Sequence, residues 1–413
     1  MNPAMHPREA AVAFGLDCKD EWRVQLDGAR FGLLANMGSV DRDLRYAWDV
    51  LAGACPGRLA ALFSPQHGLW GEQQANMFES AHGRHERLGV PIYSLYAESR
   101  RPSPEMLDGL DVLVIDLQDV GTRVYTFVWT ATYCLEACAR AGVRVVVLDR
   151  PNPLGGAIVE GPPLDPEFRS FVGLASIPMR HGLTLGELMR LFNAERSIGA
   201  DLHVVPVSGW HRAMTWQGML SDSRNLRDSG NLSVSRPWLP PSPNLPRMEG
   251  VEVYPGQVLL EGTNLSEGRG TTTPFEWCGA PFVEPEPLIE ALKKFDLPGV
   301  LFRPIRFVPT FDKWQGESCG GIALHLTDTA SFRPYRTTVA ILSACRTLWP
   351  SDFAWLEPPY EYETVKKPID IIAGSSQLRE MIDRTGGEVE LASLDDWDRD
   401  EWRLWIEPHL LYA

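Results

Sequence analysis

The sequence predicts an α/β protein with a Rossmann-like N-terminal domain built on a parallel sheet, followed by a second α/β domain. Three observations predict this class: short apolar runs, helical segments between them, and polar clusters where the runs end. Near-continuous apolar runs are typical of strands buried on both faces, and their alternation with helices favours βαβ units. The 413 residues are enough for two domains.

Five runs have the length and composition of buried strands, at residues 31–37, 59–64, 91–96, 112–117 and 143–148. The segment 126–142 between the last two is long enough for a helix and ends at Gly142, a typical C-cap residue. Ligands bind beyond the carboxyl ends of strands in open parallel sheets. The polar residues that follow these runs therefore predict a site at that edge.

Proline and glycine become dense after residue 155, and we place the domain boundary near 160, dividing the chain into 1–160 and 161–413. Thr184 and Glu187 form a capping-box pattern that predicts a helix start, and HVVPV at 203–207 predicts a strand. Residues 245–283 are expected to be mostly loop. The tail predicts strands at 301–308 and 320–326, and helices at 336–348, 376–384 and 394–408.

The composition disfavours several classes of partner and site. The net charge of −15 disfavours nucleic acid, because an acidic surface repels phosphates. Seven scattered cysteines do not suggest a disulfide framework, and Cys134 and Cys138 are expected to be buried helix residues rather than metal ligands. Without a leader or an apolar run of membrane length, we expect a cytoplasmic protein without membrane contact, secreted or periplasmic if a leader is missing.

The first polar cluster, SPQHGLWGE at 64–72, directly follows the second strand. His67 can donate, accept or carry a proton near neutral pH. Glu72 and Glu79 follow in the same loop. A structured turn with a hydrogen-bonded histidine is the alternative interpretation.

The second cluster, DLQDVGTRVYT at 116–126, is dense in groups that hydrogen-bond sugar hydroxyls, and its tyrosine offers a ring for stacking. Its candidate residues are Asp116, Gln118, Asp119, Arg123 and Tyr125. The structural alternative is that Asp119 pairs with Arg123 and Thr126 caps the helix. Asn152, between two prolines after the fifth strand, is as consistent with a rigid corner as with ligand contact.

The third cluster, EGTNLSEGRGT at 261–271, brings two carboxylates and an arginine into one glycine-rich loop. Its candidates are Glu261, Asn264, Glu267 and Arg269. Glycosidases need an acid and a second carboxylate, or a substitute such as the substrate's acetamide. An ion-paired structural loop is the alternative. No Walker A loop, dinucleotide fingerprint or nucleophile elbow occurs in the expected place.

The motifs HGLWGEQQANM, DLQDVGTRVYTFVWT, LDRPNPLGG, PSPNLP and LEGTNLSEGRGTTTPFEWCGAP occur in this order. Together they resemble the exo-β-N-acetylmuramidases of the NamZ type, formerly a domain of unknown function, over nearly the whole chain from residue 28. The resemblance implies a smaller C-terminal α/β domain, a cleft between the domains, and removal of N-acetylmuramic acid from the non-reducing ends of peptidoglycan fragments without a metal or organic cofactor.

The two carboxylate-rich loops and the family resemblance together suggest functional roles. Glu267 or Glu79 is expected to protonate the leaving oxygen, with Asp116, the other glutamate or the substrate's acetamide in the second role and His67 nearby. Arg269 or Arg123 would hold the lactyl carboxylate. The remaining positions carried over as substrate-binding residues are Gln118, Asp119, Tyr125, Asn152, Glu261 and Asn264, with Glu72 added from the first cluster.

The first loop departs from the commoner family pattern. Gln66 stands where a glutamate is usual, Trp70 replaces an arginine, and Met77 replaces a second glutamate. A catalytic carboxylate in that loop is therefore missing unless Glu72 or Glu79 replaces it. This departure motivates a second hypothesis, a sugar-binding protein that has lost catalysis. The missing leader motivates a third, a hydrolase or transferase acting inside the cell on another amino sugar, acylated sugar or anionic sugar.

Overall fold

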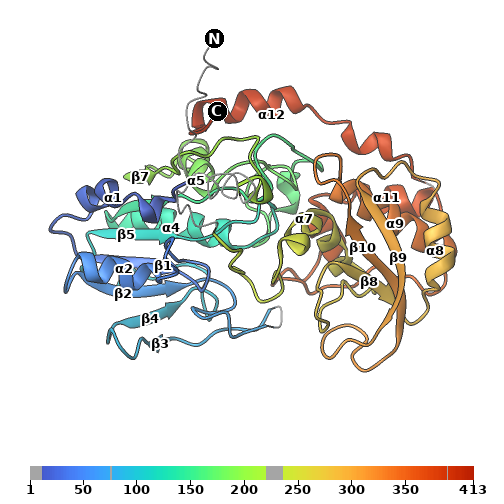
Figure 1. Cartoon of the computed structure of the whole chain (residues 1–413), viewed down its shortest axis with the longest axis horizontal. Coiled ribbons are helices and arrows are strands. Elements are labelled where there is room, and N and C mark those ends of the chain that lie inside the picture. The colour runs from blue at the N-terminus through green and yellow to red at the C-terminus, as the bar shows by residue number, and fades with distance from the viewer. Residues whose placement is uncertain (1–11, 75–76, 220–235, 388) are drawn as a thin grey trace, which may run out of the picture.

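The computed structural model describes residues 12–74, 77–219, 236–387 and 389–413, which form two α/β halves (Figure 1). The N-terminal half holds a seven-stranded sheet in the order β3-β4-β2-β1-β5-β6-β7. All its neighbouring strands are parallel except the edge pair β3 and β4. The strands are β1 (Phe31–Ala35), β2 (Leu59–Ser64), β3 (Gly83–Arg84), β4 (Pro91–Ser94), β5 (Val112–Asp116), β6 (Arg144–Leu148) and β7 (Leu202–Val205).

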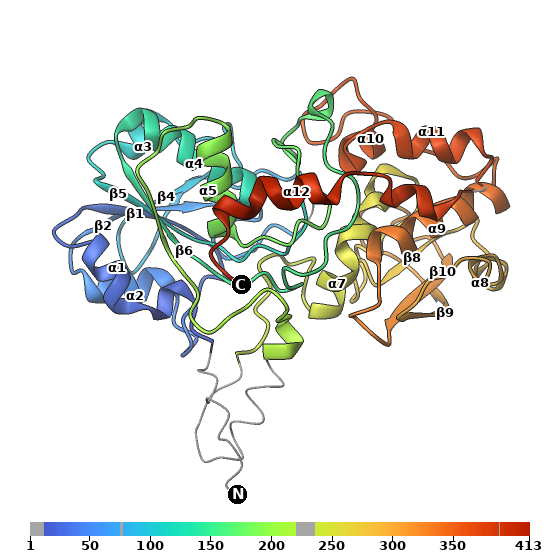
Figure 2. The same ribbon diagram turned by 90° about the horizontal axis from the view of Figure 1, so that it is seen from above.

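Helices cover both faces of this sheet, as Figure 2 shows from above. Trp22 of α1 (Lys19–Gln25) and Trp48 of α2 (Ala47–Ala54) pack on one face. The other face packs against α3 (Pro104–Leu107), α4 (Phe127–Ala141) and α5 (Leu185–Glu195). Burial on both faces explains why the strands are almost entirely apolar in sequence.

The C-terminal half is a smaller antiparallel sheet in the order β8-β10-β9, covered by helices. Its strands are β8 (Trp277–Ala280), β9 (Val300–Phe307) and β10 (Cys319–Leu326). Its helices are α7 (Met248–Gln257), α8 (Pro285–Leu292), α9 (Pro334–Leu348), α10 (Pro368–Ala373) and α11 (Gln377–Arg384). The family-like fold class predicted from the sequence, a parallel Rossmann-like layer plus a smaller α/β domain, is confirmed.

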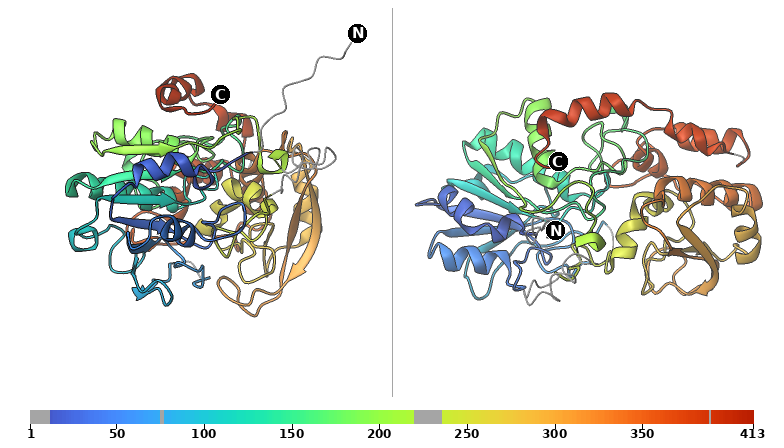
Figure 3. Two further views of the ribbon diagram at one scale, coloured as in Figure 1. Left: turned by 60° about the vertical axis from the view of Figure 1, so that its left-hand side comes forward. Right: turned by 45° about the horizontal axis from the view of Figure 1, so that its top comes forward.

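The end of the chain returns to the N-terminal half. Helix α12 (Arg399–Ile406) runs back over both halves, and the C-terminus lies against the parallel sheet region (Figures 2 and 3). The Tyr412 hydroxyl donates to the buried Asp149 carboxyl at 2.6 Å, and the Arg212 amide donates to the Ala413 carbonyl at 2.8 Å. These contacts tie the two halves together.

Most predicted elements are present. The five early strands, the strand near 203 and both tail strands lie where expected, and Gly142 has the left-handed conformation of a C-cap. The capping box of Thr184 and Glu187 is also confirmed. The interpretation that the Thr126 side chain caps the helix is wrong, because its hydroxyl donates to Gln66 Oε1 at 2.8 Å instead of bonding to a helix amide.

The expectation of loop for residues 245–283 is wrong in part. Helix α7 continues into the 3₁₀ helix Val258–Gly262 despite Pro255 and Gly256 within it. A side chain at Gly256 would collide with the carbonyl of Pro334, so the close packing of α9 on α7 requires this glycine. The division at residue 160 stays a prediction. β7, beyond that point, belongs to the N-terminal sheet.

All seven cysteines are free, and Cys134 and Cys138 are buried in α4 as expected. Within the described residues, no helix has both the length and the apolar character needed to cross a bilayer. In the same part of the chain, no three His, Cys, Asp or Glu side chains gather as a metal site would require.

Candidate active site

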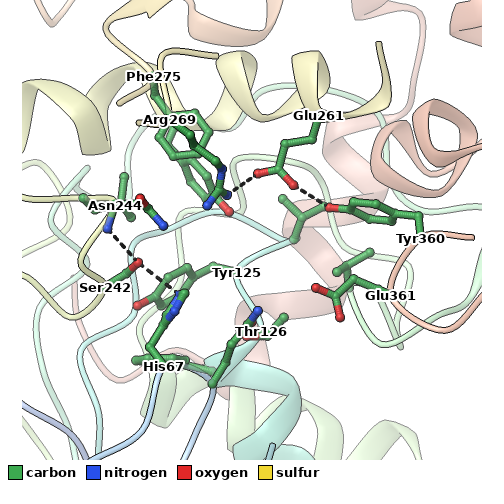
Figure 4. Close-up of a pocket in the computed structure, with 16 residues that line it drawn as sticks. His67, Tyr125, Thr126, Ser242, Asn244, Glu261, Arg269, Phe275, Tyr360 and Glu361 are labelled. Carbon is green, nitrogen blue, oxygen red and sulfur yellow. Dashed lines mark hydrogen bonds and ion pairs between the residues drawn. The ribbon is translucent and has the colours of Figure 1, made fainter. Parts of the chain in front are cut away.

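A pocket lies between the two halves, beyond the carboxyl ends of β2 and β5. These strands flank β1, where the winding of the sheet reverses, and open α/β sheets bind ligands at such a point. We call this cavity the central pocket (Figure 4). The polar side chains that line it are Gln66, His67, Tyr125, Thr126, Ser242, Asn244, Tyr254, Glu261, Arg269, Tyr360 and Glu361.

The loop after β2 places His67 in the wall. Its Nδ1 is 2.7 Å from the Gln73 carbonyl and its Nε2 is 3.3 Å from the Ser242 hydroxyl. A carbonyl only accepts, so Nδ1 carries the hydrogen and Nε2 accepts from Ser242. Burial lowers the pKa of His67 to about 4. His67 is therefore neutral at physiological pH and joins the first loop to residues 242–245.

An ion-pair chain forms the wall from the C-terminal half. Arg269 Nη2 donates to Glu261 Oε1 at 2.6 Å, and the Tyr360 hydroxyl donates to Glu261 Oε2 at 2.8 Å (Figure 4). Arg269 Nε lies 3.1 Å from Glu267 Oε1, and Lys313 Nζ lies 2.8 Å from Glu267 Oε2. The two carboxylates are balanced by two cations, which permits their burial.

Three polar atoms on the pocket wall are buried without a hydrogen-bond partner: the Tyr125 hydroxyl, Asn244 Oδ1 and Arg269 Nη1. Burying a hydroxyl, an amide oxygen and a guanidinium N–H without hydrogen-bond partners costs free energy. A ligand rich in hydroxyl, amide and carboxylate groups would satisfy all three. The pocket is therefore suited to a polar ligand such as an acidic amino sugar.

Four of the residues predicted from sequence line the central pocket: His67, Tyr125, Glu261 and Arg269. Glu267 lines an adjoining pocket that shares Glu261, Arg269 and Tyr360. Burial tends to raise its pKa, but Lys313 and Arg269 outweigh burial and hold the pKa of Glu267 below its usual value. An acid held in its ionised form is poorly suited to donate a proton, so the geometry does not support the role of proton donor predicted for Glu267.

The other two predicted catalytic carboxylates do not line the central pocket. The Asp116 carboxylate is fully buried in a bidentate contact with Arg150, at 2.6 and 2.9 Å. Glu79 is exposed in a side pocket, where its Oε1 accepts from the Tyr362 hydroxyl at 3.3 Å. Asp116 ends β5 and Arg150 follows β6, its parallel neighbour in the sheet. Their ion pair therefore gives Asp116 a structural role.

Arg123 is also architectural. Its guanidinium donates to the carbonyls of Pro162, Ile177, Ile372 and Ala373 at 2.8–3.0 Å, so it neither pairs with Asp119 nor faces the central pocket. Asp119 instead accepts from the Gly121 amide at 2.7 Å and lies 3.4 Å from His181.

The remaining predicted residues hold loops in place. Gln118 donates to the carbonyls of Asp119 and Pro151, and Asn152 donates to that of Leu183. Asn264 bonds to the backbone at residues 352 and 354. Glu72 is exposed and accepts from the Trp70 amide.

Sequence reasoning missed Ser242, Asn244, Tyr360 and Glu361. The first two lie within the PSPNLP motif, whose resemblance to the family could have indicated them. Tyr360 and Glu361 lie in the segment PPYEYE at 358–363, which carries no recognisable motif. Only the fold brings that segment onto the pocket.

The α/β architecture, with a pocket between its halves that holds two carboxyl groups and unpaired polar atoms, is that of a two-domain glycoside hydrolase. Models of the N- and C-terminal domains of the exo-beta-N-acetylmuramidase NamZ match residues 31–249 and 252–412. The chain belongs to the NamZ family of exo-β-N-acetylmuramidases.

Individual relatives agree with this assignment. The chain is 43% identical over 384 residues to the peptidoglycan beta-N-acetylmuramidase NamZ of Bacillus subtilis (strain 168), covering 93% of this chain and 87% of that protein. Two crystal structures of DUF1343 family proteins from Bacteroides fragilis superpose with TM-scores of 0.83 and 0.73, at 31% and 27% identity. Each match covers 98% of this chain, and they cover 100% and 99% of the two relatives.

Proposed function

We propose that this protein is an exo-β-N-acetylmuramidase that releases N-acetylmuramic acid from the non-reducing end of short peptidoglycan fragments. The observation that carries the proposal is the meeting of two carboxyl groups, Glu261 and Glu361, in one enclosed pocket beside unpaired polar atoms. The B. subtilis relative named for this activity, which is similar along nearly the whole chain, supports the substrate class.

The shape of the pocket supports exo action. Its walls come from loops of both halves, and a pocket enclosed in this way accepts the end of a chain more readily than its middle. The unpaired Nη1 of Arg269 is the group best suited to bind the lactyl carboxylate of muramic acid. The guanidinium stays charged because, although burial lowers its pKa, Glu261 and Glu267 raise it further.

A matched pair of chromogenic glycosides tests the proposal directly. The 4-nitrophenyl β-glycosides of N-acetylmuramic acid and N-acetylglucosamine differ only in the lactyl ether. We expect release from the first and a much lower kcat/KM for the second. Faster cleavage of the N-acetylglucosamine compound would contradict the assigned substrate, and a wider panel of acidic sugars would then identify another.

A second pair of substrates tests whether the enzyme recognises muramic acid at the end of a chain. Disaccharides with N-acetylmuramic acid at the non-reducing end should be cleaved, whereas those with N-acetylglucosamine at that end should remain intact. Cleavage of both would refute terminal recognition of muramic acid.

Gln66 favours one alternative, a sugar-binding protein without turnover, because an amide replaces the carboxylate usual in that loop. Calorimetry separates the two functions. Binding of muramyl sugars without product formation over hours would establish the binding protein, and measurable turnover would exclude it.

A further inference from the structure

Glu361 is a buried carboxyl group on the central pocket that no sequence motif indicates. It is 4% exposed and lies in the segment between α9 and α10. Figure 4 shows its carboxyl group turned into the pocket, on the same side as Glu261. Glu361 and Tyr362 both have left-handed backbone conformations, with φ of 44° and 68°, which are unfavourable for residues other than glycine. Packing must therefore hold Glu361 in this position.

Two side chains from the N-terminal half fix the carboxyl group. The Tyr96 hydroxyl donates to Glu361 Oε2 at 3.0 Å. The Gln66 side chain forms a second hydrogen bond to Glu361. Because Gln66 Oε1 already accepts from Thr126, its amide N–H faces the carboxyl group. The residue that departs from the family pattern thus orients Glu361.

The environment of Glu361 favours the protonated carboxyl group far more than water does. Burial and the nearby charge of Glu261 raise its pKa to about 7, although bonds from Tyr96 and Gln66 and the charge of Arg100 act in the opposite direction. The charged and titratable side chains around it are Glu261, Arg100, Tyr96, Tyr254, Tyr360 and Tyr362.

Glu261 has a contrasting environment in the same pocket. It is ion-paired with Arg269 and accepts from the Tyr360 hydroxyl. Glu261 is thus paired with a cation, whereas the side chains that bond to Glu361, Tyr96 and Gln66, are neutral. Two carboxyl groups in one pocket, only one of them ion-paired, are suited to serve as an acid and its partner in a glycosidase.

We propose that Glu361 is the catalytic acid that protonates the glycosidic oxygen, an assignment that rests on the proposed function. The Glu361 carboxyl transfers its proton to the bridging oxygen while the bond from that oxygen to C1 breaks. The rest of the glycan leaves as an alcohol, and Glu361 remains as a carboxylate. Water then supplies a hydroxyl group to C1, and its other proton restores the acid on Glu361.

No other side chain of the central pocket meets this requirement equally well. Gln66 has no acidic proton, and His67 is neutral, with both ring nitrogens already hydrogen-bonded. Glu261 is committed to its ion pair with Arg269. Among the described pocket residues, Glu361 therefore combines a transferable proton with access to the cavity.

Leaving-group dependence tests the assignment in the full-length protein. An alcohol must be protonated as it leaves, whereas 4-nitrophenolate leaves without help. We expect Glu361→Gln to lower kcat/KM on a muramic acid–glucosamine disaccharide by about 100-fold or more, and on the 4-nitrophenyl glycoside by less than about 10-fold. The control Glu363→Gln changes a carboxylate in the same segment that bonds to the Val365 amide, and both rates should stay near wild type.

The outcomes separate the two proposals. If wild type cleaves neither substrate, the proposed function fails. If wild type is active but Glu361→Gln loses both substrates equally, or retains the disaccharide activity, only the assignment of the acid fails.

The pH dependence of the wild-type enzyme provides a second test of the assignment. With the disaccharide, kcat/KM should fall above about pH 7 as Glu361 loses its proton, and with the nitrophenyl glycoside this alkaline limb should be absent. The same limb with both substrates would overturn the assignment.

Discussion

Replacing Arg123 should destabilise the protein without altering sugar recognition. Its guanidinium is fully buried and donates to four carbonyls. Pro162 and Ile177 belong to the connection between β6 and β7, whereas Ile372 and Ala373 belong to α10. Arg123 therefore crosslinks segments about 200 residues apart in sequence, and its removal leaves four buried acceptors without donors.

The magnitude follows from these four bonds. At a net value of about 1–1.5 kcal/mol each, Arg123→Met should lower the free energy of unfolding by roughly 4–6 kcal/mol. Arg123→Lys restores part of the network, because an ammonium group donates only three hydrogens without the planar geometry, so about half of that loss is expected. Urea denaturation followed by tryptophan fluorescence measures both values. Arg140→Met is the control, because this exposed residue at the end of α4 should change stability by less than about 0.5 kcal/mol.

Two results would refute the reasoning. Arg123→Met within about 1 kcal/mol of wild type would show that the carbonyls find other partners. Alternatively, a folded Arg123→Lys variant with a raised KM for the muramic acid glycoside, but not for the glucosamine glycoside, would return Arg123 to the lactyl-binding role suggested by the sequence.

Three further predictions concern the pocket and the helix beside it. Tyr96→Phe removes a donor that favours the ionised form of Glu361, so the alkaline limb for the disaccharide should move to higher pH; a limb that does not move, or moves down, contradicts the contact. The folded pKa of Glu361, about 7, lies above an unfolded value near 4.3, so its contribution to stability is present at low pH and lost as pH rises through this window. Relative to Glu361→Gln, the free energy of unfolding of wild type should therefore fall by roughly 3 kcal/mol between pH 4 and pH 8, measured by urea denaturation at each pH. The same pH dependence of unfolding for both proteins would argue against burial of a protonated acid. Gly256→Ala should cost at least about 2 kcal/mol, because the new methyl group meets the Pro334 carbonyl, whereas Gly53→Ala, which meets nothing within 4 Å, should be neutral or stabilising in thermal melts.

The motif residues illustrate how far a sequence can point to a site. His67, Tyr125, Glu261 and Arg269 come from three loops, and all line the central pocket. Their clusters were recognisable because two of them follow predicted strands and the third combines acids and an arginine with glycines. A local signal was therefore enough to find three of the segments that form the site.

The same signal could not separate catalytic residues from structural ones. Asp116 and Arg123 lie in the same motif as Tyr125, yet Asp116 pairs with Arg150 from the next strand and Arg123 bonds to distant carbonyls. Whether a charged residue faces a substrate or a structural partner depends on where that partner lies. The partners here are 34 and about 250 positions away in the chain.

The sequence by itself determined the parallel sheet, several of the helices, and three of the loops that form the site, because these follow from the spacing of apolar residues and local backbone preferences. Only the tertiary structure decided that Glu361, about 100 positions beyond Glu261, completes the pocket. The physical reason is that the pKa of a carboxyl group and its access to a ligand depend on burial and nearby charges, which packing between distant segments creates.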